Sequence, residues 1–413
     1  MPVISRLACR AYYRLTVGGG RVAPDGPALI VANHTNSLMD PALVVVAARR
    51  KVRFMAKSTL FTHRAIGWLV RAVGSVPVYR RQDDPKAVSQ NYDSFRDVSA
   101  ALAQGYAVGI FPEGISHSAS RLQPLKTGAA RIALGAALKS GAAFPIVPVG
   151  LVFRDRRSFR SAAHIVIGDG FAWDDIATRG PNDKEAVREL TRRIDVSLRR
   201  VTLNLHDWSD EQLVRCAERV WRAEFEVPGD ARDEMLRLRA ATTALSRLRL
   251  GEDSGWRRVA RALRAHDRML TRMGLTPRAL KERVSGDAAL RWTLSRIPQI
   301  AFVPLAAIGW ALCWIPREVT GALAEKLAKP EGEDAVPTYR VLVGFLFFLA
   351  WFGALGAASS FALGAWGGLA VFLALPFVAF GALAVGESQR ATWEAVRRFF
   401  VLRLQRKRVA ALR

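Results

Sequence analysis

Short apolar runs alternate with helix-like stretches along the first half of the chain. Helical periodicity is clear over Ala87–Gln104 and Gly128–Lys139, between such runs. This alternation is typical of parallel sheets with helices on both faces. Residues 1–205 are therefore predicted to form an α/β domain with a mostly parallel sheet flanked by helices. Its strands are expected at Ala28–Val31, Val52–Met55, Ser75–Tyr79, Ala107–Phe111, Ile146–Phe153 and His164–Ile167.

The pattern changes at residue 206. Residues 206–296 show no strand signal and are predicted to form a basic helical arm. Gly274 is placed as a helix stop, and Thr276 followed by Pro277 is typical of a helix start. Apolar positions in Trp256–Met273 recur with a helical period, so one face of this helix should pack against other residues.

Residues 297–387 are predicted to be a membrane region. The stretch Val341–Val385 is uncharged throughout and long enough for two spans, expected at Val341–Leu363 and Ala365–Val385. Gly364, Gly367 and Gly368 with Trp366 are expected to mark the turn between them. Ile297–Ile315 is also uncharged but contains prolines, and we expect it to be re-entrant or interfacial. A third full span and a buried soluble hairpin are the alternatives.

Arginines flank this region on both sides, before residue 297 and in the tail 388–413. Positive flanks stay on the cytoplasmic side, and two spans would place both there. We therefore expect C-terminal transmembrane helices, a basic cytoplasmic tail and a cytoplasmic catalytic domain at a bacterial inner membrane. The N-terminus lacks a signal-peptide core because Arg6, Arg10 and Arg14 interrupt it. It is expected to form an interfacial helix or an ordinary amphipathic first helix.

The composition adds an anionic partner to this picture. The chain has 61 Lys and Arg against 36 Asp and Glu, a net charge of +25, yet 50% of its residues are hydrophobic. Such a charge suits nucleic acid, an anionic membrane or phosphorylated substrates. No nucleic-acid-binding signature is present. The partners expected are therefore anionic membrane lipids and phosphorylated substrates, with no nucleic acid. The three cysteines are far apart and have no metal-ligand spacing.

A histidine and an aspartate follow the first predicted strand. His34 is a candidate general base, because an imidazole titrates near pH 6.5 and can accept a proton from a hydroxyl. Asp40 would hold the other ring nitrogen, provided that the intervening residues form a turn. The alternative for Asp40, with Pro41 behind it, is a helix N-cap followed by a first-turn proline.

A second candidate block, Phe111-Pro112-Glu113-Gly114, follows a later strand. Gly114 permits a tight turn whose backbone N–H groups could bind an anion. Three polar residues follow, Ser116, His117 and Ser118, and the alternative for His117 is a solvated loop histidine.

Four cations could bind a phosphate near these blocks. Lys126 lies just before a predicted helix N-terminus, where anions are favoured. Arg80 and Arg81 follow a predicted strand and offer guanidinium forks, and Lys57 lies two residues beyond another. Solvated surface positions are the alternative for Arg80, Arg81 and Lys57.

The order of these blocks resembles the PlsC-like glycerolipid acyltransferases. The resemblance implies a glycerophosphate-acyltransferase-like fold, no metal, and no cofactor beyond acyl-CoA or acyl carrier protein as the acyl donor. Five residues separate His34 from Asp40, as in the fungal-type glycerol-3-phosphate and dihydroxyacetone-phosphate acyltransferases, whereas the commoner pattern has four. Ser116 stands where many relatives have arginine. The resemblance implies substrate binding by Asn36, Lys57, Arg80, Arg81, Glu113, Gly114, Ser116, His117, Ser118 and Lys126.

Three functions are weighed. The leading one is a membrane-bound 1-O-acyltransferase that acts on glycerol 3-phosphate or dihydroxyacetone phosphate in phospholipid biosynthesis, with His34 as base and Asp40 orienting it. A lysophosphatidate acyltransferase shares the chemistry and differs in acceptor. A non-catalytic membrane adaptor would use the basic arm to bind anionic lipid.

Overall fold

The computed structural model divides the chain into two compact units. The sheet unit comprises Met1–Asp210, Gly229–Ala244 and Glu331–Thr338, and the helical unit comprises Glu211–Pro228, Leu245–Pro330 and Tyr339–Arg413. These units do not coincide with the four segments expected from composition, because two later segments group with the sheet. The structure describes residues 2–62, 67–72, 74–79, 86, 89, 91–225, 231–250, 255–281, 287, 291–292, 294–296, 302–405 and 409.

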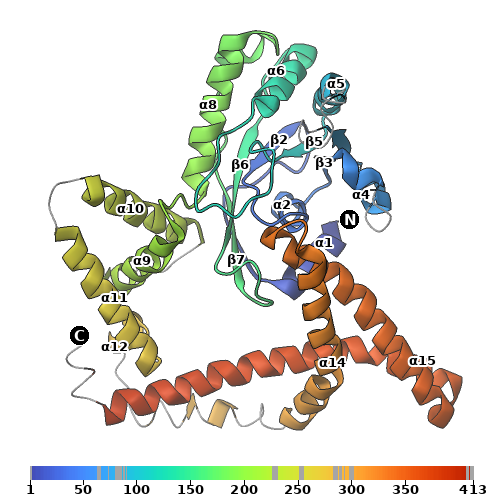
Figure 1. Cartoon of the computed structure of the whole chain (residues 1–413), viewed down its shortest axis with the longest axis vertical. Helices are drawn as coiled ribbons and strands as arrows, with labels where there is room; N and C mark the ends of the chain where they lie inside the picture. The colour runs from blue at the N-terminus through green and yellow to red at the C-terminus, as the bar shows by residue number, and fades with distance from the viewer. Residues whose placement is uncertain are drawn as a thin grey trace. The chain divides into compact units, whose positions relative to one another are not determined.

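A seven-stranded sheet with strand order β1-β7-β6-β2-β5-β3-β4 forms the centre of the sheet unit (Figure 1). Neighbouring strands are parallel except for the antiparallel pair β6–β7, so the predicted mostly parallel sheet is confirmed. The strands are β1 (Arg14–Gly19), β2 (Ala28–Ala32), β3 (Val52–Lys57), β4 (Val76–Val78), β5 (Ala107–Ile110), β6 (Ile146–Phe153) and β7 (Ala162–Ile167).

The edge strand β1 was not predicted. It pairs with β7 alone and is mostly exposed, so its sequence lacks an apolar run. By contrast, all of β2 is buried, because the sheet is covered on both faces.

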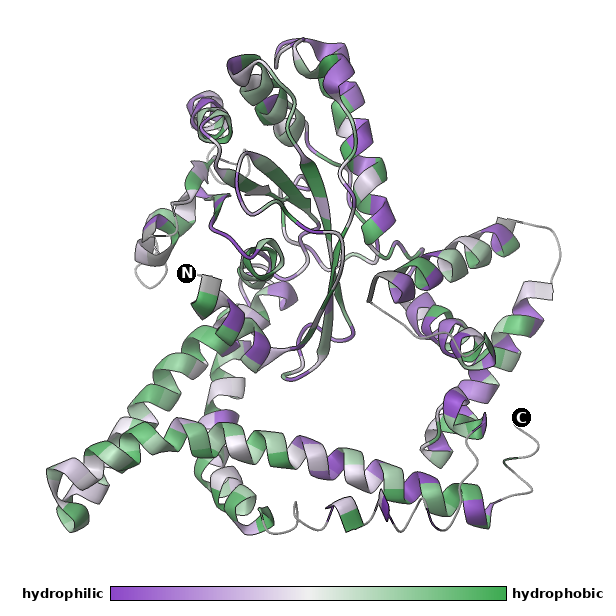
Figure 2. Ribbon diagram, turned by 180° about the vertical axis from the view of Figure 1, so that it is seen from behind, coloured by the Kyte–Doolittle hydropathy of each residue, from purple (hydrophilic) through white to green (hydrophobic). Residues whose placement is uncertain are grey.

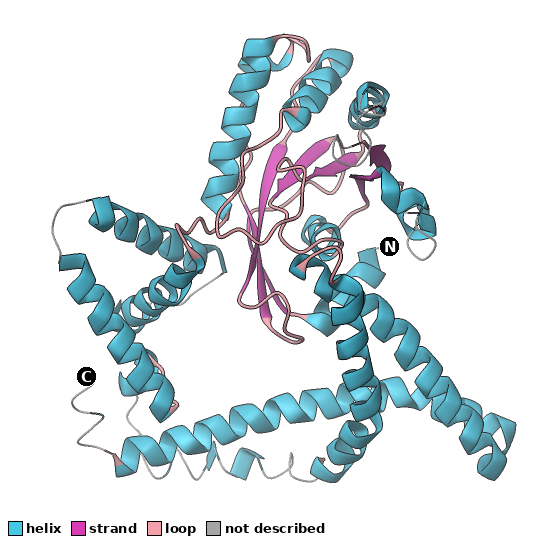
Figure 3. Ribbon diagram, viewed as in Figure 1, coloured by secondary structure: helices cyan, strands magenta, loops and turns pink. Residues whose placement is uncertain are grey.

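Helices surround this sheet (Figure 3). They are α1 (Pro2–Tyr12), α2 (Met39–Ala48), α3 (Ser58–Thr62), α4 (Gly67–Ala72), α5 (Asn91–Ala103), α6 (Gly128–Ser140), α7 (Asp174–Ala177) and α8 (Lys184–Val201). Local signals set their ends: the Asp183 carboxylate accepts the N–H groups of Glu185 and Ala186 at the start of α8, and Gly141 (φ 75°) ends α6.

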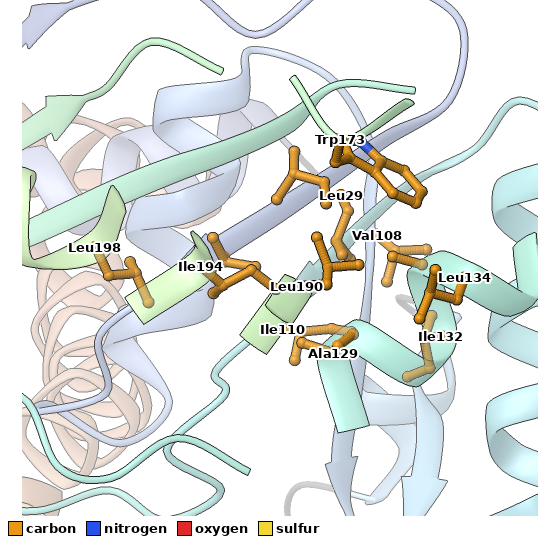
Figure 4. Close-up of a cluster of buried hydrophobic side chains, with 14 of the residues drawn as sticks. Leu29, Val108, Ile110, Ala129, Ile132, Leu134, Trp173, Leu190, Ile194 and Leu198 are labelled. Carbon is orange, nitrogen blue, oxygen red and sulfur yellow. The ribbon is translucent and has the colours of Figure 1, made fainter. Parts of the chain in front are cut away.

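The main hydrophobic core lies between the sheet and the helices α5, α6 and α8. Leu29 and Val31 of β2 and Val108 and Ile110 of β5 point to the same face, as the two-residue period of a strand requires. They meet Ala129, Ile132 and Leu134 of α6, Leu190, Ile194 and Leu198 of α8, and the fully buried Trp173 (Figure 4). This packing holds the carboxyl ends of β2 and β5 side by side.

The helical unit contains α9 (Glu211–Phe225), α11 (Gly255–Met273), α12 (Pro277–Lys281), α14 (Val303–Ala328) and most of α15 (Val336–Leu404), while α10 (Ala231–Leu250) is divided between the units. Two helix limits predicted from sequence are confirmed. Gly274 (φ 66°) follows the last residue of α11, and the Thr276 hydroxyl accepts the Ala279 N–H at the start of α12.

The apolar helix α15 changes direction at Gly364, where φ is 71° and ψ is 170°, so the predicted turn is confirmed. Its two arms pack closely beside the turn, since a Cβ on Gly368 would lie 2.6 Å from the Gly356 carbonyl oxygen. Among the described residues, one helix, Glu333–Leu404, is long and apolar enough to cross a membrane by length and composition (Figure 2). Both predicted spans fall within it. Helix α14 begins at Val303, within the predicted stretch Ile297–Ile315. Residues 297–301 of that stretch lie outside the described residues.

Candidate active site

His34 and Glu113 leave neighbouring parallel strands at the same edge of the sheet. β2 ends at Ala32 and β5 ends at Ile110, and the two strands pair in parallel. Asn33 fixes the exit of β2, because its side-chain amide accepts the N–H of Leu151 (2.7 Å) and donates to its carbonyl (3.0 Å). Open α/β sheets bind their ligands at this edge.

His34 and Asp40 are in direct contact. Nδ1 of His34 lies 2.9 Å from Oδ2 of Asp40, and the same oxygen accepts the N–H groups of Thr35 and Asn36, both at 2.7 Å. The chain turns back through Ser37, whose φ is 46°. The turn that the sequence required is therefore present, and Nε2 of His34 is the ring nitrogen left for a substrate.

Burial dominates the electrostatics of Asp40. The carboxylate is fully buried, which raises its pKa above the ordinary value, while the hydrogen bonds from His34, Asn36 and Thr35 act in the opposite direction. Such a carboxylate favours the ring tautomer with the proton on Nδ1, because an ionised carboxylate only accepts hydrogen bonds.

The helix-cap interpretation of Asp40 is wrong. Helix α2 begins at Met39 and its N-cap is Leu38, so Asp40 and Pro41 lie inside the first turn. The carboxylate instead binds the backbone of the loop that precedes the helix, since the turn at Ser37 brings that loop beside it.

Glu113 joins the two loops of the site rather than facing a substrate. Its Oε1 accepts the His34 N–H (2.8 Å), and its Oε2 accepts the Gln123 N–H (2.7 Å) and contacts Nε2 of His117. These three bonds use most of the accepting capacity of a side chain that is 1% exposed. These contacts give Glu113 a supporting role, and the substrate-binding role expected for it stays a prediction.

His117 is not a solvated loop histidine. Its side chain is 11% exposed, and its Nδ1 accepts the Ala119 N–H at 3.1 Å, which places the ring proton of the neutral form on Nε2, facing Glu113. Its backbone N–H donates to the His34 carbonyl (3.1 Å). His117 therefore also supports the site from behind.

Phe111 stacks on the His34 ring. The ring centroids lie 4.2 Å apart with an interplanar angle of 18°, and Phe54 lies beyond Phe111 at 6.1 Å. Gly109 leaves the space that Phe54 occupies, since a Cβ there would approach the Phe54 ring to 2.3 Å. The stack limits rotation of the His34 ring.

Asn36 is a supporting residue as well. It is fully buried, and its Nδ2 donates to the Tyr13 hydroxyl at 2.7 Å, which in turn donates to the Arg156 carbonyl at 2.6 Å. The substrate contact expected for Asn36 stays a prediction, and its Oδ1 has no hydrogen-bond partner among the described residues. Sequence reasoning missed Tyr13, which lies at the end of α1 with no local motif around it.

Arg156 was missed too. Its guanidinium donates from Nη1 to the carbonyls of Thr35 (3.2 Å) and His117 (3.4 Å), so it bridges both loops. The only sequence signal was the basic run that follows the strand β6.

Gly114, Ser116 and Ser118 differ in which of their hydrogen-bonding groups remain available to a ligand. Gly114 has the expected positive φ (76°), but its N–H donates to the Phe111 carbonyl and is not free for an anion. The Ser116 hydroxyl accepts the Ser37 N–H at 3.1 Å and keeps its own proton to donate. Ser118 is half-buried, and its carbonyl accepts the indole N–H of Trp208.

The expected cations are only partly placed. Lys126 is exposed before α6, and its stem lies against Gly114, where a Cβ would be 3.3 Å from Lys126 Cγ. Lys57 ends β3 and is half-buried. Arg80 and Arg81 lie outside the described residues. Within the described part of the chain, no group of three or more His, Cys, Asp or Glu could hold a metal ion.

The arrangement can therefore accept a proton at Nε2 of His34 and share the resulting charge with Asp40. Residues 14–152 match the protein family described as Acyltransferase. This segment belongs to the acyltransferase family, and the chain carries an enzyme domain of that type.

Several individual proteins are similar to parts of the chain. Glycerol-3-phosphate O-acyltransferase 2 of Saccharomyces cerevisiae is 35% identical over 135 residues, which cover 32% of this chain and 18% of that protein. A 1-acyl-sn-glycerol-3-phosphate acyltransferase of Streptococcus pneumoniae is 27% identical over 45% of this chain and 64% of that protein. The chain thus spans less than a fifth of the length of the two yeast relatives that it matches.

A solved structure is also similar. The crystal structure of the 1-acyl-sn-glycerophosphate acyltransferase PlsC from Thermotoga maritima has a TM-score of 0.35 and 21% sequence identity, and the match covers 48% of this chain and 77% of that one.

Proposed function

We propose that the chain is a membrane-bound 1-O-acyltransferase that transfers a fatty acyl group from acyl-CoA or acyl carrier protein to glycerol 3-phosphate or dihydroxyacetone phosphate. The observation that carries this proposal is the His34–Asp40 pair, with a contact of 2.9 Å at the ligand-binding edge of the sheet. Similarity to the yeast glycerol-3-phosphate acyltransferases supports the choice of acceptor.

In this reaction His34 Nε2 takes the proton of the acceptor hydroxyl while its oxygen attacks the thioester carbonyl. The C–O bond of the ester forms and the C–S bond of the thioester breaks. The imidazolium then returns the proton to the leaving thiolate. Asp40 stabilises the imidazolium and holds the ring orientation, and no enzyme nucleophile is needed because the acceptor supplies it.

The acceptor phosphate would be bound by the cations and hydroxyls near this edge. Lys126 is exposed beside Gly114, and Ser116 retains a proton to donate. Lys57, Ser118, Arg80 and Arg81 complete the proposed set. A guanidinium or ammonium group strengthens its hydrogen bonds to phosphate through charge.

A lysophosphatidate acyltransferase is the second candidate, because the matched relatives from Streptococcus pneumoniae and Brassica napus are named 1-acyl-sn-glycerol-3-phosphate acyltransferases. The mechanism would be the same, and the attacking hydroxyl would belong to a substrate that already carries one acyl chain. The five-residue gap between His34 and Asp40 favours the first candidate.

The test is radiolabelled acyl transfer by the full chain, purified in detergent, with palmitoyl-CoA or palmitoyl-acyl carrier protein as donor. Glycerol 3-phosphate, dihydroxyacetone phosphate and lysophosphatidate are offered separately. Product from either of the first two acceptors supports the proposal, and product from lysophosphatidate alone supports the second candidate. No product from any pair of substrates would contradict both and leave the adaptor function.

The matched variants are His34→Ala and His206→Ala. We expect His34→Ala to lower the rate by about 10²–10⁴-fold, the usual contribution of a general base. His206 is exposed in the same unit, so its replacement should leave the rate unchanged. Equal rates for the two variants would exclude His34 as the base.

A further inference from the structure

A row of arginines follows one face of α11 in the helical unit. Arg257, Arg261, Arg264, Arg268 and Arg272 recur every three or four residues, so they share one face of the helix over about 22 Å. Every one of them is exposed. We call these five residues the arginine row. In the described part of the chain, none of them forms an ion pair.

Helix α8 shows what an ordinary solvated basic helix looks like in the same chain. Its Arg192 and Arg193 contact Glu189 at 2.8 Å, and its Arg199 contacts Asp195 at 2.7 Å. Each of these three arginines has an acidic neighbour one turn away, which reduces its free energy in solution. These three charges therefore require no external partner.

The acidic residue of α11 does not compensate its arginines. Asp267 lies on the buried face, where it accepts hydrogen bonds from Arg219 (2.5 Å) and Gln212 (2.9 Å) of α9. Five like charges on one face repel one another, and a bound anion removes that cost. The arrangement indicates an anionic partner outside the described residues.

The contacts of α11 with α15 indicate which anion the arginine row binds. Leu270 and Met273 share a buried cluster against which Val401 and Leu402 of α15 pack, and Arg397 donates to the Arg272 carbonyl at 2.9 Å. The arginine row is thus joined to the polar end of the helix that is apolar enough to cross a membrane. The nearest anionic surface for a helix attached in this way is the layer of lipid headgroups.

We propose that the arginine row binds the headgroups of anionic phospholipids at the surface of the membrane that α15 enters. This rests on the membrane location in the proposed function and not on its acyl-transfer chemistry. Guanidinium forks suit phosphate oxygens, and the row is long enough to contact several headgroups at once. Bound lipid would hold the helical unit at the membrane surface independently of substrate.

The test measures the thermal unfolding midpoint of the full chain in neutral detergent micelles, to which phosphatidylglycerol or phosphatidylcholine is added. Phosphatidylglycerol should raise the midpoint more than phosphatidylcholine does, because it binds the folded chain, and added salt should weaken the effect. In Arg261→Gln/Arg264→Gln/Arg268→Gln, half-saturation should need roughly a hundredfold more phosphatidylglycerol. The charge-retaining variant Arg261→Lys/Arg264→Lys/Arg268→Lys should keep most of the response.

The matched control is Arg188→Gln/Arg192→Gln/Arg199→Gln, which removes the same charge from one face of α8. It should respond to phosphatidylglycerol as the original chain does. An unchanged response in the α11 variant, an equal loss in both variants, or binding of the row to nucleic acid without a lipid response would overturn the proposal. Acyl transfer by the α11 variant in neutral micelles is measured in parallel. If the chain shows no acyl transfer but still responds to phosphatidylglycerol, only the proposed function is contradicted.

Discussion

The hydroxyl of Tyr13 lies 2.7 Å from Nδ2 of Asn36, and this bond joins the end of α1 to the loop that carries His34. The Tyr13 hydroxyl also donates to the Arg156 carbonyl, while the Asn36 N–H donates to Asp40. A continuous buried network therefore runs from the β6–β7 connection to the proposed base. Its members fix where the imidazole lies without contacting a substrate.

Tyr13→Phe should loosen this network without removing the ring. The Asn36 amide and the Arg156 carbonyl each lose a partner in a buried position, which should cost about 1–3 kcal/mol of stability. We expect kcat to fall roughly ten- to a hundredfold, through misplacement of His34, with little change in KM. Steady-state kinetics and thermal unfolding check both expectations.

Tyr12→Phe is the control for that substitution. Tyr12 is the preceding residue and donates to the Arg157 carbonyl, outside the Asn36 network. Its variant should lose stability but keep kcat. A kcat loss of the same size in both variants would show that the Tyr13 effect is general and not transmitted through Asn36.

Asp40→Asn should lower kcat by about 10²–10⁴-fold while the chain still folds. One oxygen of Asp40, Oδ2, contacts His34 and accepts the N–H groups of Thr35 and Asn36, so an amide oxygen in its place keeps these contacts but carries no charge to stabilise the imidazolium. The rate of acyl transfer measures the loss, and full activity of this variant would contradict the role assigned to Asp40.

The same variant should change how stability depends on pH. Burial raises the pKa of Asp40 above its unfolded value of 3.8, so the folded chain holds this proton more tightly than the unfolded chain. The contribution of that proton is fully present below pH 3.8 and is lost as pH rises through the folded pKa. The asparagine in Asp40→Asn does not titrate. The thermal unfolding midpoint of this variant should therefore rise relative to that of the original chain as pH increases. If the unfolding midpoints of the two chains changed with pH in the same way, the raised pKa of Asp40 would be refuted.

Glu113→Gln should separate the two loops of the site. The carboxylate accepts hydrogen bonds from His34, His117 and Gln123, and an amide would place its NH₂ against at least one of these donors. We expect a loss of about 2–3 kcal/mol in stability together with reduced activity. Thermal unfolding and acyl transfer measure the two effects. The exposed Glu185, changed to Gln, should leave both unaltered, and a Glu113 variant as stable as that control would exclude the supporting role.

Local sequence determined most of the elements of the sheet unit. Apolar runs such as Ala28–Val31 and Ile146–Phe153 became strands because hydrophobic side chains on both faces can only be buried between layers of helices. The stop at Gly274 and the turn at Gly364 were equally local, since both need a backbone conformation that glycine adopts at low cost. The His34 and Glu113 blocks were found because they follow strands that had already been recognised.

The tertiary structure alone decided what these residues do to one another. Asn36 and Glu113 look like substrate ligands in the sequence, yet both are buried among partners that lie far away along the chain, Tyr13 and His117 among them. The edge strand β1 and the bridging Arg156 left no local signal, because edge pairing and long side-chain contacts depend on which surfaces meet. Hydrophobic periodicity is a property of neighbouring residues and so can be read from the sequence, whereas hydrogen-bond partners across the fold are selected only when the sheet and its helices have packed.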